Sequence, residues 1–116
     1  MTVQEKGGGW TPICDVGALP VDRGVTALVR GHAIAIFLTA TGEVYAIANH
    51  DPFSRTGALG RGIVGVRGEV PFVFTPEGRR AFDLRSGRCL DDASVTVPSY
   101  AVRVVEGVVT VGPRAG

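Results

Sequence analysis

The sequence predicts an all-β fold, an antiparallel β-sandwich or barrel, and three observations lead to that class. Apolar runs of about four to eight residues recur along the chain. Glycine-containing turns separate these runs, and no long stretch repeats its apolar residues at the helical period. Val, Ile, Phe and Tyr, which favour pleated sheets, dominate the runs. At 116 residues the chain is long enough to bury its own core, so we expect a single domain over residues 1–116.

The apolar runs define the expected strands. They cover residues 10–14, 25–30, 33–39, 43–48, 63–66, 71–75, 81–84, 100–105 and 108–112. Residues 33–38 are apolar at successive positions rather than alternate ones, so this strand should be central and covered on both faces. Residues 15–20 leave room for one turn of helix at most, because Gly17 weakens it and Pro20 ends it. Residues 1–8 and 113–116 are expected to be frayed.

Turn chemistry supports hairpins between these strands. A glycine stands in each expected hairpin turn, where a positive φ is needed, at Gly31, Gly42, Gly68, Gly87 and Gly107. The last hairpin alternates clearly: Val102 and Val104 share one face, and Arg103 lies on the other.

Charge and hydropathy exclude several classes of function. The net charge is +1, which does not provide the basic footprint of a nucleic-acid-binding protein. Residues 1–9 contain no apolar run, so the sequence predicts no signal peptide, no membrane span and a cytoplasmic location.

One local charge asymmetry remains inside this near-neutral total. Residues 55–88 hold seven arginines: Arg55, Arg61, Arg67, Arg79, Arg80, Arg85 and Arg88. Against three acidic residues in the same stretch, Glu69, Glu77 and Asp83, they leave a local charge of +4. Two interpretations stay open: these arginines decorate solvated turns, or they form a surface for a protein partner, where arginine is enriched.

No catalytic or metal-binding constellation emerges from the sequence. The four residues best able to ligate a transition metal are Cys14, His32, His50 and Cys89. They are separated by 18, 18 and 39 residues, which does not match the spacing of a zinc site, so we expect no metal. The thiols should be buried structural residues without a disulfide. His50, Asp51 and Ser54 lie on one short loop, where a catalytic triad is not expected, and no glycine-rich loop suggests a nucleotide.

Residues 44–53 and 73–78 resemble the two ligand loops of a Rieske iron–sulfur domain, in which two cysteines hold one iron and two histidines the other. The expected cysteine and histidine of the first loop, Cys-x-His, are replaced by Asp51 and Phe53. Those of the second loop, Cys-x-x-His, are replaced by Thr75 and Gly78. The resemblance therefore implies a Rieske-like fold whose ligand positions are vacated, with no cofactor. It also implies that both loops meet at one end of the barrel, where Phe53 should pack inward.

Three further blocks stand in a characteristic order: Asn49-x-Asp51-Pro52-Phe53, Arg61-Gly62-Ile63 and Cys89-Leu90-Asp91-Asp92. With them, the chain from Trp10 onward is similar to the small subunits of assimilatory, pyridine-nucleotide-dependent nitrite reductases. This resemblance implies an accessory subunit without an active site of its own. Its partner would be a large subunit that carries flavin, a [4Fe–4S] cluster and sirohaem and reduces nitrite to ammonium.

The leading hypothesis is therefore a cluster-free subunit that binds this large subunit. Candidate contact residues are Asn49, His50, Arg61, Arg79 and Arg80. Two alternatives remain: a Rieske-like electron carrier that holds a [2Fe–2S] cluster by unusual ligands, or a Rieske-like β module that binds another partner.

Overall fold

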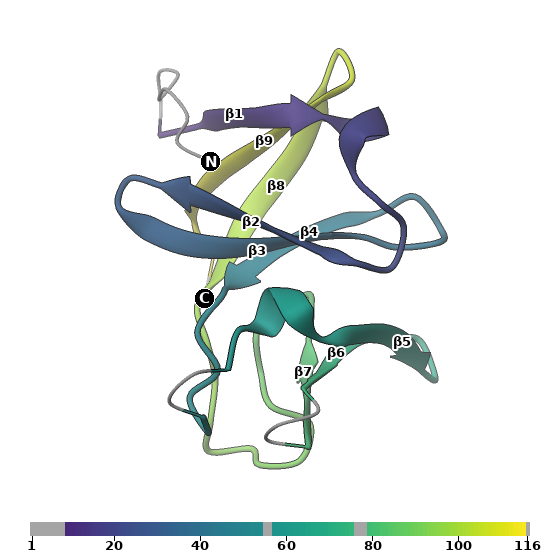
Figure 1. Ribbon diagram of the computed structural model, residues 1–116, viewed down its shortest axis with the longest axis vertical. Coiled ribbons are helices and arrows are strands. Elements are labelled where there is room, and N and C mark those ends of the chain that lie inside the picture. The colour runs from purple at the N-terminus through teal and green to yellow at the C-terminus, as the bar shows by residue number, and fades with distance from the viewer. Residues whose placement is uncertain (1–8, 55–56, 76–78, 116) are drawn as a thin grey trace.

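The computed structural model describes residues 9–54, 57–75 and 79–115. They form two antiparallel sheets, a larger one above a smaller one in the view of Figure 1. The larger sheet has six strands in the order β1-β9-β8-β4-β3-β2, and the smaller has three in the order β5-β6-β7. The predicted all-β class is confirmed.

All nine predicted strands are present. They are β1 (Thr11–Asp15), β2 (Gly24–Val29), β3 (His32–Leu38), β4 (Val44–Ala48), β5 (Ile63–Arg67), β6 (Val70–Thr75), β7 (Arg80–Asp83), β8 (Ser99–Val105) and β9 (Val108–Arg114). The short helix η1 (Val16–Ala18) lies where one turn at most was predicted. A second turn, η2 (Leu59–Arg61), was not predicted, because three residues around a glycine carry no helical pattern. Neither of these helices, the ones found in the described residues, is long enough to cross a membrane.

Strand β3 is buried on both faces, as its sequence predicted. Ile34 and Ile36 point into a first core, and Ala35 and Phe37 point into a second. The alternation of side chains along a strand separates these two pairs. One strand therefore contributes to both cores of the domain.

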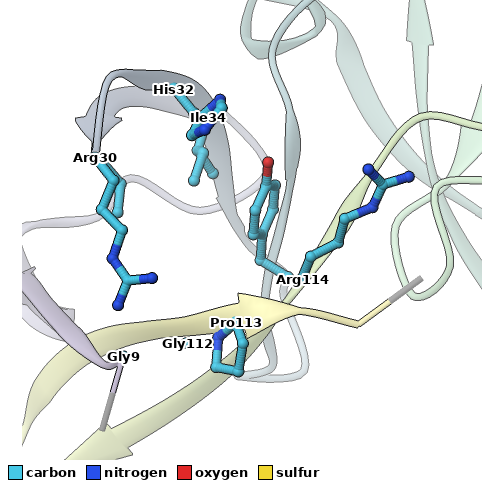
Figure 2. A pocket seen from close by; sticks show the side chains of 9 residues that line it. Gly9, Arg30, His32, Ile34, Gly112, Pro113 and Arg114 are labelled. Carbon is cyan, nitrogen blue, oxygen red and sulfur yellow. The ribbon is translucent and has the colours of Figure 1, made fainter. Parts of the chain in front are cut away.

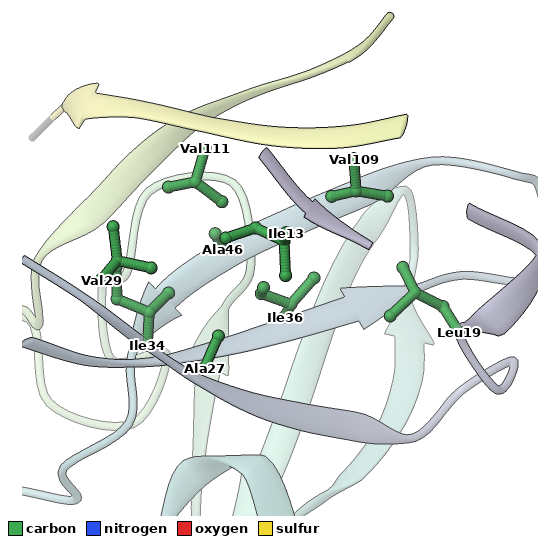
Figure 3. Close-up of a cluster of buried hydrophobic side chains, with 9 residues drawn as sticks. All are labelled: Ile13, Leu19, Ala27, Val29, Ile34, Ile36, Ala46, Val109 and Val111. Atoms are coloured by element: carbon green, nitrogen blue, oxygen red, sulfur yellow. The ribbon is translucent and has the colours of Figure 1, made fainter. Parts of the chain in front are cut away.

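The first core lies inside the curled six-stranded sheet, and the second lies between that sheet and the smaller one. Figure 3 shows the first core, built from Ile13, Leu19, Ala27, Val29, Ile34, Ile36, Ala46, Val109 and Val111. The second contains Ala35, Phe37, Ile47, Leu59, Val73, Phe82, Leu84, Cys89 and Val97. The smaller sheet is thus attached to the larger through apolar packing.

The turns behave as predicted. The five turn glycines, Gly31, Gly42, Gly68, Gly87 and Gly107, have φ between 66° and 90°. Another glycine is required by close approach: a Cβ on Gly24, at the start of β2, would lie 2.3 Å from the carbonyl oxygen of Gly60 in η2. This contact brings η2, and the loop that leads into it, tightly against the larger sheet.

Pro113 and Arg114, two of the residues expected to be frayed, belong to β9. Arg114 pairs with Tyr100, and the register between β8 and β9 shifts just beyond that pair. Such an irregularity accommodates Pro113, which has no N–H for the ladder. The N–H of Ala115 also donates to the carbonyl of Ser99 at 2.7 Å. Residues 1–8 and 116 lie outside the described residues.

Truncation of either face of β3 should destabilise the whole domain. We expect Ile36→Ala to cost about 2–5 kcal/mol and Phe37→Ala about 3–5 kcal/mol of unfolding free energy, because both side chains are fully buried. Urea unfolding should stay a single transition in both variants, with half-exposed Leu28→Ala as a mild control. Separate transitions for the two cores would contradict a shared central strand.

Candidate functional site

The two loops that resemble Rieske ligand loops meet at one end of the domain. Arg80, the first residue of β7, pairs with Thr75 at the end of β6. Its guanidinium carbon lies 4.7 Å from the centre of the Phe53 ring, which belongs to the other loop. The predicted proximity of the two loops is confirmed by this contact.

Asp51 closes the first loop from inside. It is fully buried, and its Oδ1 accepts a hydrogen bond from the Phe53 N–H at 2.9 Å, an Asx turn across Pro52. The Asp51 N–H donates to the Gly57 carbonyl at 3.2 Å, and its own carbonyl accepts from Ser54 N–H at 3.2 Å. Its Oδ2 has no hydrogen-bond partner within the described part of the chain. Hydrogen bonds thus hold this loop where a Rieske domain would use a metal ligand.

Phe53 occupies space beside the second core, as predicted. Its ring centre lies 6.2 Å from that of Phe82 at an interplanar angle of 47°, and it packs against the core while remaining partly exposed. Arg80 covers the ring from another direction, in a cation–π contact. A phenyl ring therefore stands where a histidine ligand would approach the iron.

Thr75 closes the second loop in a similar way. It is buried, and its hydroxyl donates to the Arg80 carbonyl at 3.3 Å, while the Arg79 N–H donates to the Thr75 carbonyl at 2.6 Å. The fourth vacated position, Gly78, lies outside the described residues. A carboxylate, a phenyl ring and a hydroxyl do not provide the thiolates and imidazoles of a Rieske cluster, so these positions do not fit that cofactor.

The candidate contact residues differ in exposure and in the hydrogen bonds that they make. Asn49 has a structural role: its Oδ1 accepts from the Gly60 N–H at 2.8 Å, and its carbonyl accepts from the Leu59 N–H at 2.7 Å. His50 is exposed on the same loop, and Arg79 is exposed in the β6–β7 turn with φ of 51°. Sequence patterns gave no sign that Asn49 joins the loop to η2. Partner contact at all of these positions stays a prediction.

Arg61 lies apart from the two loops, in an open groove of about 470 Å³. The groove lies between the start of β2 and the start of β5, and its lining consists of Pro20, Asp22, Arg23, Gly24, Gly60, Arg61, Gly62 and Ile63. Arg61 and Arg80 are therefore separate basic positions rather than one cluster.

A second cavity, of about 250 Å³, lies beside the β2–β3 turn (Figure 2). Arg30 and Arg114 both contribute to its lining, but Figure 2 shows their guanidinium groups pointing to different sides. A small anion needs donors that converge on one point, and these two groups do not converge.

The thiols and acidic groups do not form a metal site among the described residues. Cys14 and Cys89 are free, and Cys89 is buried as predicted, whereas Cys14 is only partly buried. Burial, followed by the negative charge of Asp15, raises the pKa of Cys14, which keeps this thiol protonated and a poor metal ligand.

Asp83 and Arg85 form an ion pair at the end of β7. The Asp83 Oδ1 accepts from the backbone N–H of Arg85 at 2.8 Å and from its Nε at 3.2 Å, and the Asp83 Oδ2 accepts from its Nη2 at 3.1 Å. Burial alone would raise the pKa of Asp83, but these hydrogen bonds outweigh it and lower the pKa below its ordinary value of 3.8.

Replacing Asp51 should show how much its hydrogen bond to the loop backbone contributes to stability. We expect Asp51→Ala to lower the unfolding free energy by about 1–3 kcal/mol, because the Phe53 N–H loses its acceptor. Asp51→Asn keeps that acceptor, so it should cost less than Asp51→Ala, although its amide NH2 takes the place of the buried Oδ2 that has no partner in the described residues. Urea unfolding measures both, and equal losses in the two variants would contradict the role of the hydrogen bond.

The Asp83–Arg85 pair should make stability depend on pH. Because the pKa of folded Asp83 is lowered, its contribution is complete above the unfolded value and is lost as pH falls through the folded pKa. Wild type should therefore exceed Asp83→Asn in urea midpoint near pH 6, and the gap should shrink as pH falls below roughly 4, the pKa of a free Asp. A gap that does not change with pH would contradict the lowered pKa.

Comparison with known proteins agrees with this geometry. Residues 9–112 match the family model of the Rieske-like [2Fe-2S] domain. The small subunit of nitrite reductase (NADH) from Escherichia coli K12 is 34% identical over 101 residues, which are 86% of this chain and 94% of that protein. A crystal structure from Mycobacterium tuberculosis, assigned as an NADH-dependent nitrite reductase small subunit, has a TM-score of 0.86 and 42% identity, covering 92% of this chain and 96% of that one.

One further relative has a different organisation. The nitrite reductase [NAD(P)H] large subunit of Klebsiella oxytoca is 36% identical over 103 residues, which are 89% of this chain but 11% of that protein. In that relative, the equivalent domain is therefore a small part of the large-subunit polypeptide. The fold and the near full-length identity lead to one conclusion: the chain belongs to the Rieske-like [2Fe–2S] domain family and, within it, to the nitrite reductase small subunits.

Proposed function

We propose that this protein is a cluster-free, non-catalytic subunit that binds a nitrite reductase large subunit in the cytoplasm. The observation that carries the proposal is that side chains hold both ligand-like loops. Asp51 accepts a hydrogen bond within the first loop, and Phe53 packs between Phe82 and Arg80. In the second loop, the Thr75 hydroxyl donates to the Arg80 carbonyl. A domain whose ligand positions do not fit a cluster acts through its surface. The Klebsiella relative, which carries the same domain inside a large subunit, supports the choice of partner.

The end of the domain where the loops around Asp51 and Thr75 meet, here called the loop end, is suited to contact with a protein. His50 and Arg79 are exposed there, and Arg80 is held in place by its strand pairing and by the Phe53 ring. The exposed Arg79 offers a planar guanidinium, which binds a carboxylate by two parallel hydrogen bonds. We infer that this end contacts acidic groups on the large subunit.

All redox chemistry would then belong to the partner, through the flavin, the [4Fe–4S] cluster and the sirohaem that the sequence resemblance implies. The small subunit would stabilise or orient that enzyme. The alternative of an electron carrier is disfavoured by Asp51 and Phe53, which replace a thiolate and an imidazole of the first loop.

Titration calorimetry of the purified chain against the large subunit of the same organism tests this proposal. We expect binding that weakens with salt, and an Arg80→Ala variant that loses about 1–3 kcal/mol of binding free energy. Arg103→Ala is the matched control, because Arg103 also stacks on an aromatic ring, Trp10 at 4.0 Å, but lies on the larger sheet. The rate of nitrite reduction by the large subunit should change when the chain is added.

Two outcomes would contradict the proposal. Absence of binding by the wild type would exclude the large subunit as partner. Equal losses for Arg80→Ala and Arg103→Ala would exclude the loop end as a contact surface.

A further inference from the structure

The smaller sheet has an outer face that the loop end does not include. Cross-strand pairing places three pairs on that face: Ile63 with Phe74, Gly65 with Phe72, and Arg67 with Val70. Of the intervening residues, Val64 and Val73 point the other way and pack in or against the second core. We call this set of six residues on β5 and β6 the outer face.

Apart from Arg67, the outer face is apolar, and it lies outside both cores. Ile63 is 64% exposed, and Phe72 and Phe74 are partly exposed. Among the described residues, neither phenylalanine belongs to the first or second core or to the side chains packed against them. A sheet face with two aromatic rings outside its own core is typical of a surface that a partner covers.

Phe72 lies at the centre of this face, and two neighbouring residues fix the position of its ring. The Phe72 ring lies over Gly65, since a Cβ at Gly65 would be 2.8 Å from Cζ of that ring. The guanidinium carbon of Arg67 lies 5.4 Å from the ring centre. Gly65 and Arg67 together hold Phe72 flat on the sheet, which resembles the arrangement of aromatic and arginine residues at binding hot spots.

The charges around the outer face favour an acidic partner. Arg67 belongs to it, and Arg61 precedes its first strand. On the neighbouring strand, Asp83 is opposite Phe72 but forms an ion pair with Arg85, and Glu69 lies in the hairpin turn between β5 and β6. The surface that complements this face is therefore apolar with carboxylates at its rim.

We propose that the outer face is a second docking surface for the large subunit, a proposal that rests on the function proposed above. Its partner surface would offer an apolar patch for Ile63 and Phe72 and carboxylates for Arg67. Phe74 is followed directly by Thr75 of the vacated loop, so the outer face borders the loop end. One partner could then contact both surfaces together.

Calorimetry of surface variants against the large subunit tests this inference. We expect Ile63→Asp and Phe72→Ala each to weaken binding about tenfold or more. Arg67→Glu should weaken it most at low salt, because exposed charges are screened as salt rises. The control is Val104→Asp, a substitution at a valine that is 46% exposed on the larger sheet and should leave binding unchanged. Urea midpoints of all variants establish that each one is folded.

The outcomes separate the two proposals. Wild-type protein that does not bind the large subunit would overturn both. Wild-type binding with outer-face variants that bind as tightly as Val104→Asp would overturn the second docking surface alone. A wild-type homodimer in sedimentation that Ile63→Asp dissociates would assign the face to a second copy and also overturn the inference.

Discussion

The burial of β3 on both faces is the constraint on which the rest of this domain depends. Ile36 lies in the core of the larger sheet, while Phe37 lies in the core that attaches the smaller sheet. The same strand holds the first ligand-like loop, because the carbonyl of Ala33 accepts a hydrogen bond from the Asn49 N–H at 3.1 Å. The position of the loop end therefore follows from the packing of one central strand.

At that end, local interactions replace what a metal cluster would supply. The Asp51 carboxylate fixes its loop through the Phe53 N–H, and the Phe53 ring extends the second core toward solvent. A Rieske cluster connects two loops through four ligands. Here Arg80 connects them by stacking on Phe53. This side-chain contact joins the two loops, and in the function proposed above it fixes the surface that meets the partner.

The strands were predictable because each is a short apolar run between turns, and the two-faced burial of β3 followed from its uninterrupted apolar sequence. The vacated ligand positions come from the resemblance of residues 44–53 and 73–78 to Rieske ligand loops, and their assignment stays a prediction. The contacts were not predictable: the hydrogen bond from Gly60 to Asn49 and the stacking of Arg80 on Phe53 join residues far apart in sequence. The outer face was also missed, since Phe72 and Phe74 follow the same alternation as core residues and only strand pairing shows which side they cover.

Anaerobic reconstitution with ferrous iron and sulfide tests the central claim most directly. If side chains close the ligand end, the protein should leave this treatment colourless, show no signal of a reduced [2Fe–2S] cluster by electron paramagnetic resonance, and unfold in urea at the same midpoint as before. A visible absorption band and a cluster signal that disappears in Asp51→Ala would show that the loop binds iron, and would contradict the account.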